Sequence, residues 1–402
     1  MRKRQGFTLL EMMVALTIGS MAITSIYFVS SASSRHFREQ QQVAQTQNAL
    51  RLAAERVRKD LLRAGFVASP YAELDSERQG CVSSDDADVQ ALSLLDGEQT
   101  ADFSLTTENP FTEFDELRLM GNYMTADEYR AEVQTATQVK IQINNQAFQR
   151  SFGVIGTTYS DAVFEEVFKP GRYLRVVHKG GGKNFHRITA VDGTAAIRTV
   201  DIDPALDSNC SAILDLVDVA PIAHIQYKTE IFRTAGGEKF EGTDVLTGQS
   251  GAEAPTLVRR EIKFNAADPI DLTVNTAQAV LEYVADFDVD FYFDQRADGA
   301  RSSINLPTLV LENDADVETA FTANIPTTGF AAGTSYPHRA MSAVIRLSVR
   351  TPTEDERFSF LARTAATEPL ARYELNTTTP GAARVRTVQM EVMLPNLAYA
   401  GL

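Results

Sequence analysis

The pattern of apolar side chains predicts one long helix at the start of the chain. Residues 7–30 are mostly apolar, and this stretch is about as long as a helix that crosses a bilayer. Across residues 35–64 apolar side chains recur at a helical period, and neither Gly nor Pro interrupts them. We therefore predict a helix over residues 7–65, with a transmembrane part and an amphipathic part that packs on a folded head. Gly65, with Pro70 shortly after it, is the expected end of the helix.

The rest of the chain predicts strands. Residues 172–178 and 184–191 flank a glycine-rich turn and are expected to form a hairpin. In residues 343–350 apolar and polar side chains alternate, and in residues 286–293 apolar and acidic side chains alternate, which is typical of antiparallel sheets with one solvated face. Further strands are expected at residues 116–120, 138–143, 222–232, 257–264, 280–293 and 386–394. The predicted fold class is α+β: the long helix packed on a large, mainly antiparallel β-rich head.

The length and charge of the chain limit its organisation and its partners. Its 402 residues are enough for one large domain or two ordinary ones. The formal net charge of −15 argues against nucleic acid as a partner, because phosphate binding needs clustered Lys and Arg. The expected divisions are a leader at 1–6, the helix at 7–65, a β-rich head region or insertion at 66–256, and a C-terminal β-sheet region of the head at 257–402.

The leader and Glu11 distinguish this N-terminus from an ordinary secretory signal. The basic leader is expected to stay on the cytoplasmic side of the membrane. Because the apolar helix then crosses the membrane once, the chain after about residue 35 is expected on the other side. A secretory signal would place a small-residue cleavage site after the apolar run and would not carry a carboxylate within it. Glu11 there would cost roughly 3 kcal/mol in a bilayer, so a cationic partner is expected. If the chain is cut after Gly6, the new amino terminus of Phe7 on a neighbouring subunit would supply that charge and set the stagger between subunits.

These residues resemble a known family. Gly6-Phe7-Thr8-Leu9-Leu10-Glu11 resembles the cleavage and methylation motif of type IV prepilins and of type II secretion pseudopilins. The resemblance implies that a prepilin peptidase cuts between Gly6 and Phe7 and then N-methylates Phe7. Phe28 stands where many major pilins carry a proline, which disfavours a major pilin. Residues 14–19, and later residues 259–262, 284–291, 344–350 and 386–396, resemble the PilW family of minor pilins.

The resemblance implies a minor type IV pilin that takes part in initiating or capping pilus assembly, and so in motility and adhesion. The implied partners are other minor pilins, the major pilin, prepilin peptidase and the inner-membrane assembly platform. The protein would be a single-pass inner-membrane protein with a periplasmic head, and then part of the extracellular fibre. The size of the head favours the fibre tip. Two alternatives stay open: a minor pseudopilin of a type II secretion system, and a tip adhesin carried on a pilin helix.

Acidic residues near the end of one predicted strand are the candidates for a metal site. Asp286, Asp288 and Asp290 share a strand face, and Asp294 and Asp298 follow it. Calcium prefers several oxygen ligands, so Asp294 and Asp298 are candidate calcium ligands in a following loop. Otherwise these acids form a solvated face, and the protein is expected to need no cofactor.

The cysteines and histidines give a disulfide prediction and no catalytic motif. Cys81 and Cys210 are the two cysteines of the chain, and outside the cytosol a bridge between them is expected. Such a bridge would stabilise the head by about 4–5 kcal/mol in the chain-entropy model. His178 and His186 flank the predicted hairpin turn without a third metal ligand. No nucleophile motif lies near a histidine, so we expect no enzymatic activity.

Overall fold

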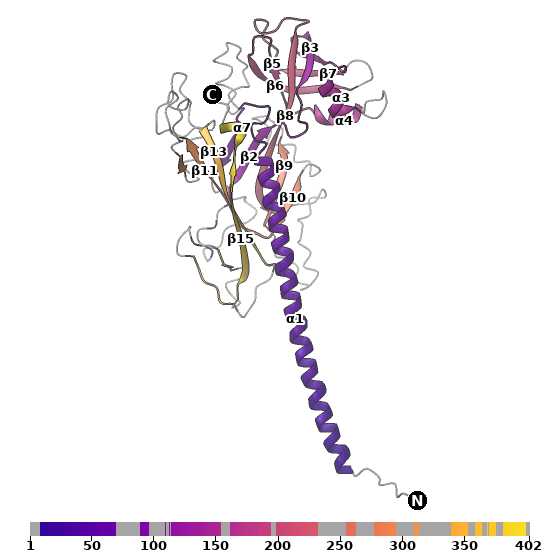
Figure 1. Ribbon diagram of the computed structural model, residues 1–402, viewed down its shortest axis with the longest axis vertical. Helices are drawn as coiled ribbons and strands as arrows, with labels where there is room; N and C mark the ends of the chain where they lie inside the picture. Colours follow the sequence, from indigo (N-terminus) through magenta and orange to yellow (C-terminus); the bar gives the residue numbers. More distant parts are fainter. Residues whose placement is uncertain are drawn as a thin grey trace, which may run out of the picture. The chain divides into compact units, whose positions relative to one another are not determined.

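The computed structural model forms two compact units, Met1–Ala49 and Leu50–Leu402 (Figure 1). The structure describes residues 9–69, 89–95, 109, 112, 114–153, 161–193, 198–231, 255–262, 277–294, 309–312, 339–352, 358–363, 368, 370–374 and 381–398. The first unit consists of the beginning of helix α1 (Leu9–Leu61), and the second contains the end of α1 and all the strands. The predicted α+β class, with a long N-terminal helix and a large antiparallel β-rich head, is confirmed.

Ten strands form the first sheet of the head. Their bounds are β1 (Leu92–Leu95), β2 (Glu116–Gly121), β3 (Tyr129–Thr135), β4 (Gln138–Ile141), β5 (Tyr173–Val177), β6 (Lys183–Asp192), β7 (Arg198–Asp203), β8 (Leu216–Ile231), β9 (Pro255–Ile262) and β10 (Gln278–Glu282). The predicted hairpin is present as β5 and β6, which pair antiparallel.

Strand β8 belongs to two parts of this sheet. Its first half pairs with β3 on one side and with β5 on the other, so β8, β3, β4, β7, β6 and β5 close into a small barrel. Its second half pairs with β2 and β9, which join β1 and β10 in an open sheet. The strand expected at residues 222–232 is the later part of β8, whereas its beginning at residues 216–221 and the change of partners along it are visible only in the structure.

The barrel has its own core. Two short helices, α3 (Gln146–Phe152) and α4 (Asp161–Val167), bring Phe148 and Phe164 against the barrel residue Tyr129 and its neighbours. Most ring pairs pack edge-on or tilted, with Phe148 and Phe152 4.6 Å apart between centroids, and Phe152 stacks on Phe168. Arg198 lies over the Phe164 ring at 5.2 Å, and its guanidinium donates to Asp161 at 2.7 Å. The described residues 129–222 of the β-rich region expected at 66–256 thus form a barrel with an aromatic core.

Five strands form the second sheet of the head, in the order β12-β11-β13-β15-β14. Their bounds are β11 (Val284–Asp294), β12 (Leu309–Glu312), β13 (Ala340–Arg350), β14 (Arg372–Tyr373) and β15 (Ala383–Met393), after which helix α7 (Pro395–Ala398) follows. The chain passes from the first sheet to the second at Tyr283, which has a positive φ of 58°. The expected strand over residues 280–293 is therefore wrong as one strand, because this kink divides it between two sheets.

The expectation of a solvated acidic face on β11 is wrong. Asp286 and Asp288 are buried, and both form ion pairs with Arg346 on β13, at 2.9 Å for Asp286. Ser348 and Arg350, expected on the wet face of β13, are buried too. Described residues between 358 and 374 cover part of this face, with Tyr373 stacked under the Arg350 guanidinium. The alternation of apolar and polar residues therefore predicted correctly which side chains of β11 and β13 share a face. The polar face was expected to be solvent-exposed, but it is covered, and its charged side chains form ion pairs.

Candidate functional site

The first part of α1 exposes an apolar surface that no described residue covers. Its exposed large side chains are Leu9, Leu10, Met12, Met13, Val14, Leu16, Ile18, Met21, Ile23, Ile26, Tyr27, Phe28 and Val29. A soluble protein does not leave so large an apolar surface in water, so this surface needs lipid or other protein around it. By length and composition, α1 is the one described helix that could cross a membrane.

Four hydroxyl side chains within this apolar part are satisfied inside the helix. The hydroxyl groups of Thr17, Ser20, Thr24 and Ser25 each donate to a backbone carbonyl three or four residues earlier, at 2.8–3.1 Å. Lipid supplies no hydrogen-bond partner, so a spanning helix must satisfy its polar groups in this way. The hydroxyls therefore do not oppose membrane insertion.

Glu11 is the acidic residue of the first described turn of α1, and its side chain is exposed. A carboxylate in this turn interacts favourably with the positive end of the helix dipole. Gly6 and Phe7 lie outside the described residues, so the cleavage after Gly6, the methylation of Phe7 and the register role of Glu11 stay predictions. The structure places Glu11 on the exposed surface, where a neighbouring chain could reach it.

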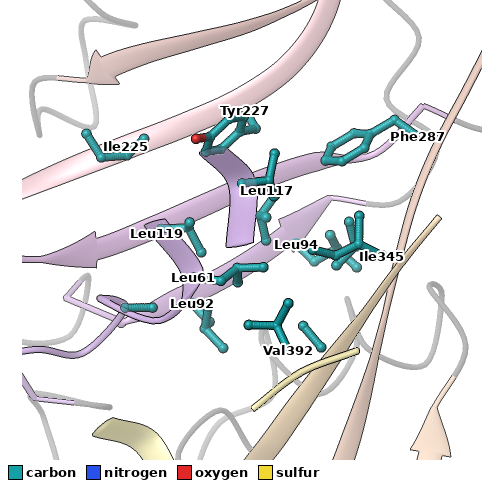
Figure 2. Close-up of a cluster of buried hydrophobic side chains, with 14 of the residues drawn as sticks. Leu61, Leu92, Leu94, Leu117, Leu119, Ile225, Tyr227, Phe287, Ile345 and Val392 are labelled. Atoms are coloured by element: carbon teal, nitrogen blue, oxygen red, sulfur yellow. The ribbon is translucent and has the colours of Figure 1, made fainter. Parts of the chain in front are cut away.

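The end of α1 is held in the head by an apolar face. Leu50, Ala53, Val57 and Leu61 are buried against both sheets of the head. Figure 2 shows Leu61 among leucines of β1 and β2, with Ile345 and Val392 of the second sheet beside them. The spacing of three or four residues between these positions is the amphipathic period that the sequence predicts. The charged side chains on the other side of the helix, Arg51, Glu55, Arg58 and Lys59, are exposed.

A buried carboxylate adds a polar anchor to this apolar face. Asp60 Oδ2 accepts hydrogen bonds from Tyr227 Oη at 2.7 Å and from Arg259 Nε at 2.6 Å. The Asp60 backbone carbonyl accepts from Tyr123 Oη at 3.1 Å. Burial first, and then the neighbouring Asp60 carboxylate, raise the pKa of Tyr227 and of Tyr123 above the usual value for tyrosine. Both phenols therefore stay protonated and act as donors to the helix.

The carbonyls at the end of α1 are capped by the head. The helix ends at Leu61, four residues before the expected Gly65, and a turn follows it. Asn396 Nδ2 donates to the carbonyls of Leu62 at 2.9 Å and of Ala64 at 3.3 Å. Gly65 has a φ of 73°, which favours glycine, and its N–H donates to Met120 O at 2.8 Å. The predicted end at about Gly65 is therefore four residues too late, and Gly65 lies in the turn that follows the helix.

Asp60 was missed in the sequence, although a signal was available. It lies on the apolar side of the helix, between the buried Val57 and Leu61, where a charged side chain is unexpected. A charge at such a position needs a partner in the head. The sequence alone could not identify the partners, because Tyr227 and Arg259 lie 167 and 199 residues away.

The histidines of the β5–β6 hairpin serve the structure. His178 Nδ1 lies 2.6 Å from Ser211 Oγ, and its Nε2 lies 2.8 Å from Asn184 Oδ1. His186 Nδ1 lies 2.8 Å from the Pro204 carbonyl. Burial lowers the pKa of His178, although the hydrogen bond with Asn184 opposes the shift. Both ring nitrogens of His178 are thus engaged within the protein.

The remaining site predictions fall partly outside the described residues. No group of three or more metal-ligating His, Cys, Asp or Glu side chains occurs within the described part of the chain. Asp294 is the last residue of β11 and is buried, whereas Asp298 lies outside the described residues. Cys210 is not a free thiol. Cys81 lies outside the described residues, so the bridge between Cys81 and Cys210 stays a prediction.

Comparison with known proteins supports the N-terminal interpretation. Residues 1–27 match the prokaryotic N-terminal methylation motif. The chain carries the N-terminal signature of a type IV pilin-like or pseudopilin protein. The matched segment includes Glu11 and most of the exposed apolar part of α1, and together they are consistent with membrane anchoring and incorporation into a pilus. No curated protein and no solved structure gives a significant match to the chain.

Proposed function

We propose that the protein is a minor type IV pilin of the PilW family that helps to initiate or cap pilus assembly. The observation that carries the proposal is the methylation motif over residues 1–27, on an exposed apolar helix whose far end is anchored in a folded head. The role is structural, and we propose no catalytic activity. The proposed partners are other minor pilins, the major pilin, prepilin peptidase and the inner-membrane assembly platform.

The proposed mechanism begins with maturation at the membrane. Prepilin peptidase removes residues 1–6 and methylates Phe7, while the apolar part of α1 holds the chain in the inner membrane and the head lies in the periplasm. On assembly, Glu11 pairs with the amino terminus of Phe7 on a neighbouring subunit, and the exposed leucines and valines of α1 leave lipid to pack between helices. The pairing compensates the cost of the buried carboxylate and sets the register.

The anchor in the head would transmit force between the fibre and the head. Residues 50–64 are joined to the head by the apolar face, the Asp60 bonds and the cap from Asn396. Because these contacts involve both sheets, the end of α1 is expected to move with the head as one body. The large head, with its inserted barrel, favours a place at the fibre tip, since a bulky domain is difficult to repeat along a close-packed shaft.

The test is a clean deletion of the gene, complemented with either the wild-type chain or Glu11→Val. Sheared surface pili and secreted proteins are measured in the same cultures. We expect loss of pili with normal secretion, restored by the wild-type chain and not by Glu11→Val. The Val side chain suits the membrane, so the level of the variant in the inner membrane should stay normal.

Other outcomes would replace the proposal. Normal pili with failed secretion would make the protein a minor pseudopilin, which shares the methylation motif. Normal pili and secretion with lost surface attachment would make it a tip adhesin. Full rescue by Glu11→Val would refute the register role of Glu11.

A further inference from the structure

Strand β15 forms an open edge of the second sheet over most of its own length. On one side β15 pairs with β13 from Val385 to Met393. On the other side the two-residue strand β14 pairs only with Ala383 and Arg384 of β15. One more bond, from Val385 N–H to Ala371 O at 3.1 Å, completes the described backbone pairing on that side. No described strand pairs with residues 386–393 there.

The direction of the open backbone groups follows from two hydrogen bonds. Val385 N–H points to the β14 side, whereas Leu394 N–H points to the β13 side and donates to Met341 O at 2.9 Å. Backbone groups alternate in direction along a strand, so odd-numbered residues of β15 point toward the open side. Those residues, each with one N–H and one C=O, are Thr387, Gln389, Glu391 and Met393. The open edge is about 25 Å long.

The side chains beside this edge are accessible. Gln389, Glu391 and Met393 are exposed, and the Met393 side chain is 58% exposed. Neither Pro nor Lys, which natural proteins use to block an edge, occurs from residue 386 to residue 393, and the two exposed charges there, Arg386 and Glu391, have opposite signs. The edge therefore has the features of a template for another strand.

The opposite edge of the same sheet is blocked by the chain itself. Asp115 N–H donates to Phe287 O of β11 at 2.9 Å, and Asp115 Oδ2 accepts from Val289 N–H at 2.7 Å. Beyond this point β12 pairs with the end of β11. The two edges thus differ. At the β11 edge, Asp115 and β12 form hydrogen bonds with backbone groups of β11, whereas at the β15 edge the backbone N–H and C=O groups of the odd-numbered residues face outward.

The two faces of β15 specify the strand that would fit. Val388 and Met390 pack on the core of the head but are only partly buried, beside the open edge. Glu391 and Gln389 lie on the other face. An added strand would cover Val388 and Met390 with apolar side chains at alternate positions, and would place a basic side chain next to Glu391. β14 and Pro395 limit such a strand to about eight residues.

We propose that residues 386–393 of β15 accept an extended segment of a neighbouring fibre subunit as an added strand. The proposal rests on the function proposed above, and it adds a backbone-directed contact between heads to the contacts between helices. Main-chain hydrogen bonds supply affinity in such strand addition, and the alternating side chains supply specificity. The segment is apolar on the face toward Val388 and Met390 and basic opposite Glu391.

The experiment uses the full chain in its own cells, with a photo-crosslinking residue in place of Met393. The adducts are digested and the joined peptides are sequenced. We expect a peptide with alternating apolar residues and a basic residue, from another protein that carries an N-terminal methylation segment. A crosslinker in place of Ile213, which is 63% exposed and precedes β8 in the barrel of the other sheet, should not give that adduct.

A proline variant separates strand addition from simple proximity. Gln389→Pro removes an outward N–H and keeps the bonds to β13, and edge strands tolerate such a proline. We expect about tenfold less adduct at Met393, because an added strand loses a hydrogen bond and its close approach. Gln389→Ala keeps the N–H and should give the wild-type yield. Equal yields from the proline and alanine variants, or an adduct formed equally from the Ile213 position, would overturn the proposal.

The state of the N-terminus distinguishes a failure of this proposal from a failure of the proposed function. If Phe7 is methylated and the chain enters fibres, equal adduct yields refute only the strand addition. If the chain is neither processed nor assembled, the proposed function is wrong. A neighbouring fibre subunit then cannot be the partner that supplies the added strand. Adducts with a protein that lacks the methylation segment would also refute the partner.

Discussion

Asp60→Ala tests the polar anchor between α1 and the head. The substitution removes the acceptor for both Tyr227 Oη at 2.7 Å and Arg259 Nε at 2.6 Å, and it leaves the Arg259 guanidinium largely buried without its anion. Removing one partner of a buried ion pair costs about 3–5 kcal/mol. Loss of a neutral hydrogen bond alone costs about 1 kcal/mol. We therefore expect the free energy of unfolding to fall by about 4 kcal/mol.

The assay is urea unfolding of the full chain in detergent, followed by circular dichroism of the head. The matched control is Glu55→Ala, which breaks an exposed pair with Arg58 at 3.3 Å on the other side of the same helix. Exposed pairs of this kind contribute about 0.3–0.5 kcal/mol, so the control should be nearly neutral. If Asp60→Ala lowers the stability no more than Glu55→Ala, the Asp60 bonds do not anchor the helix. Tyr227→Phe should fall between them, at about 1 kcal/mol.

Three further changes test other parts of the head. Burial first, and then Arg118, lower the pKa of His224 from 6.5 to about 3. Between pH 6.5 and pH 3 the unfolded chain therefore binds a proton at His224 that the folded chain does not. The free energy of unfolding should fall by about 2 kcal/mol as the pH is lowered from 7.5 to 5. Urea unfolding of His224→Gln at both pH values should show most of this pH-dependent loss removed. Gly121→Ala would place its Cβ 2.5 Å from the Arg63 carbonyl, so we expect a loss of about 2 kcal/mol, and an unchanged midpoint would contradict this packing. Arg346→Met leaves Asp286 buried without its closest cation and should cost about 3 kcal/mol in urea unfolding, and an unchanged midpoint would contradict this pairing.

Local sequence patterns were sufficient to predict the long helix, most strands of the head and the N-terminal signature of the chain. The alternation over residues 343–350 is strand β13, and the helical period of Leu50, Val57 and Leu61 gave the buried face of α1. These features depend on neighbours within a few residues, which is the range over which a single sequence is informative. The barrel was not predicted, because its closure depends on β8 pairing with β3 on one side and with β5 on the other, and these strands are distant in sequence.

The candidate site was predictable to different degrees at its two ends. Glu11 was identified because a carboxylate in an apolar run has few explanations. Asp60 was not, because its partners Tyr227 and Arg259 come from strands distant in sequence. The acids of β11 show the same limit: Asp286 looks solvent-exposed in an alternating pattern, and only the paired Arg346 and the covering segment explain its burial. Alternation predicts which side chains share a face but not what covers that face.

The most direct test of a pilin-like function is the N-terminus of the protein isolated from the inner membrane of its own cells. Mass spectrometry of the N-terminal peptide would show whether the mature chain begins at Phe7 and whether its amino group is methylated. The account predicts a chain that begins with N-methylated Phe7, and a Gly6→Val variant that keeps its leader. An N-terminus that retains residues 1–6 in the wild type, or one that begins after the apolar run near Ser33, would contradict it.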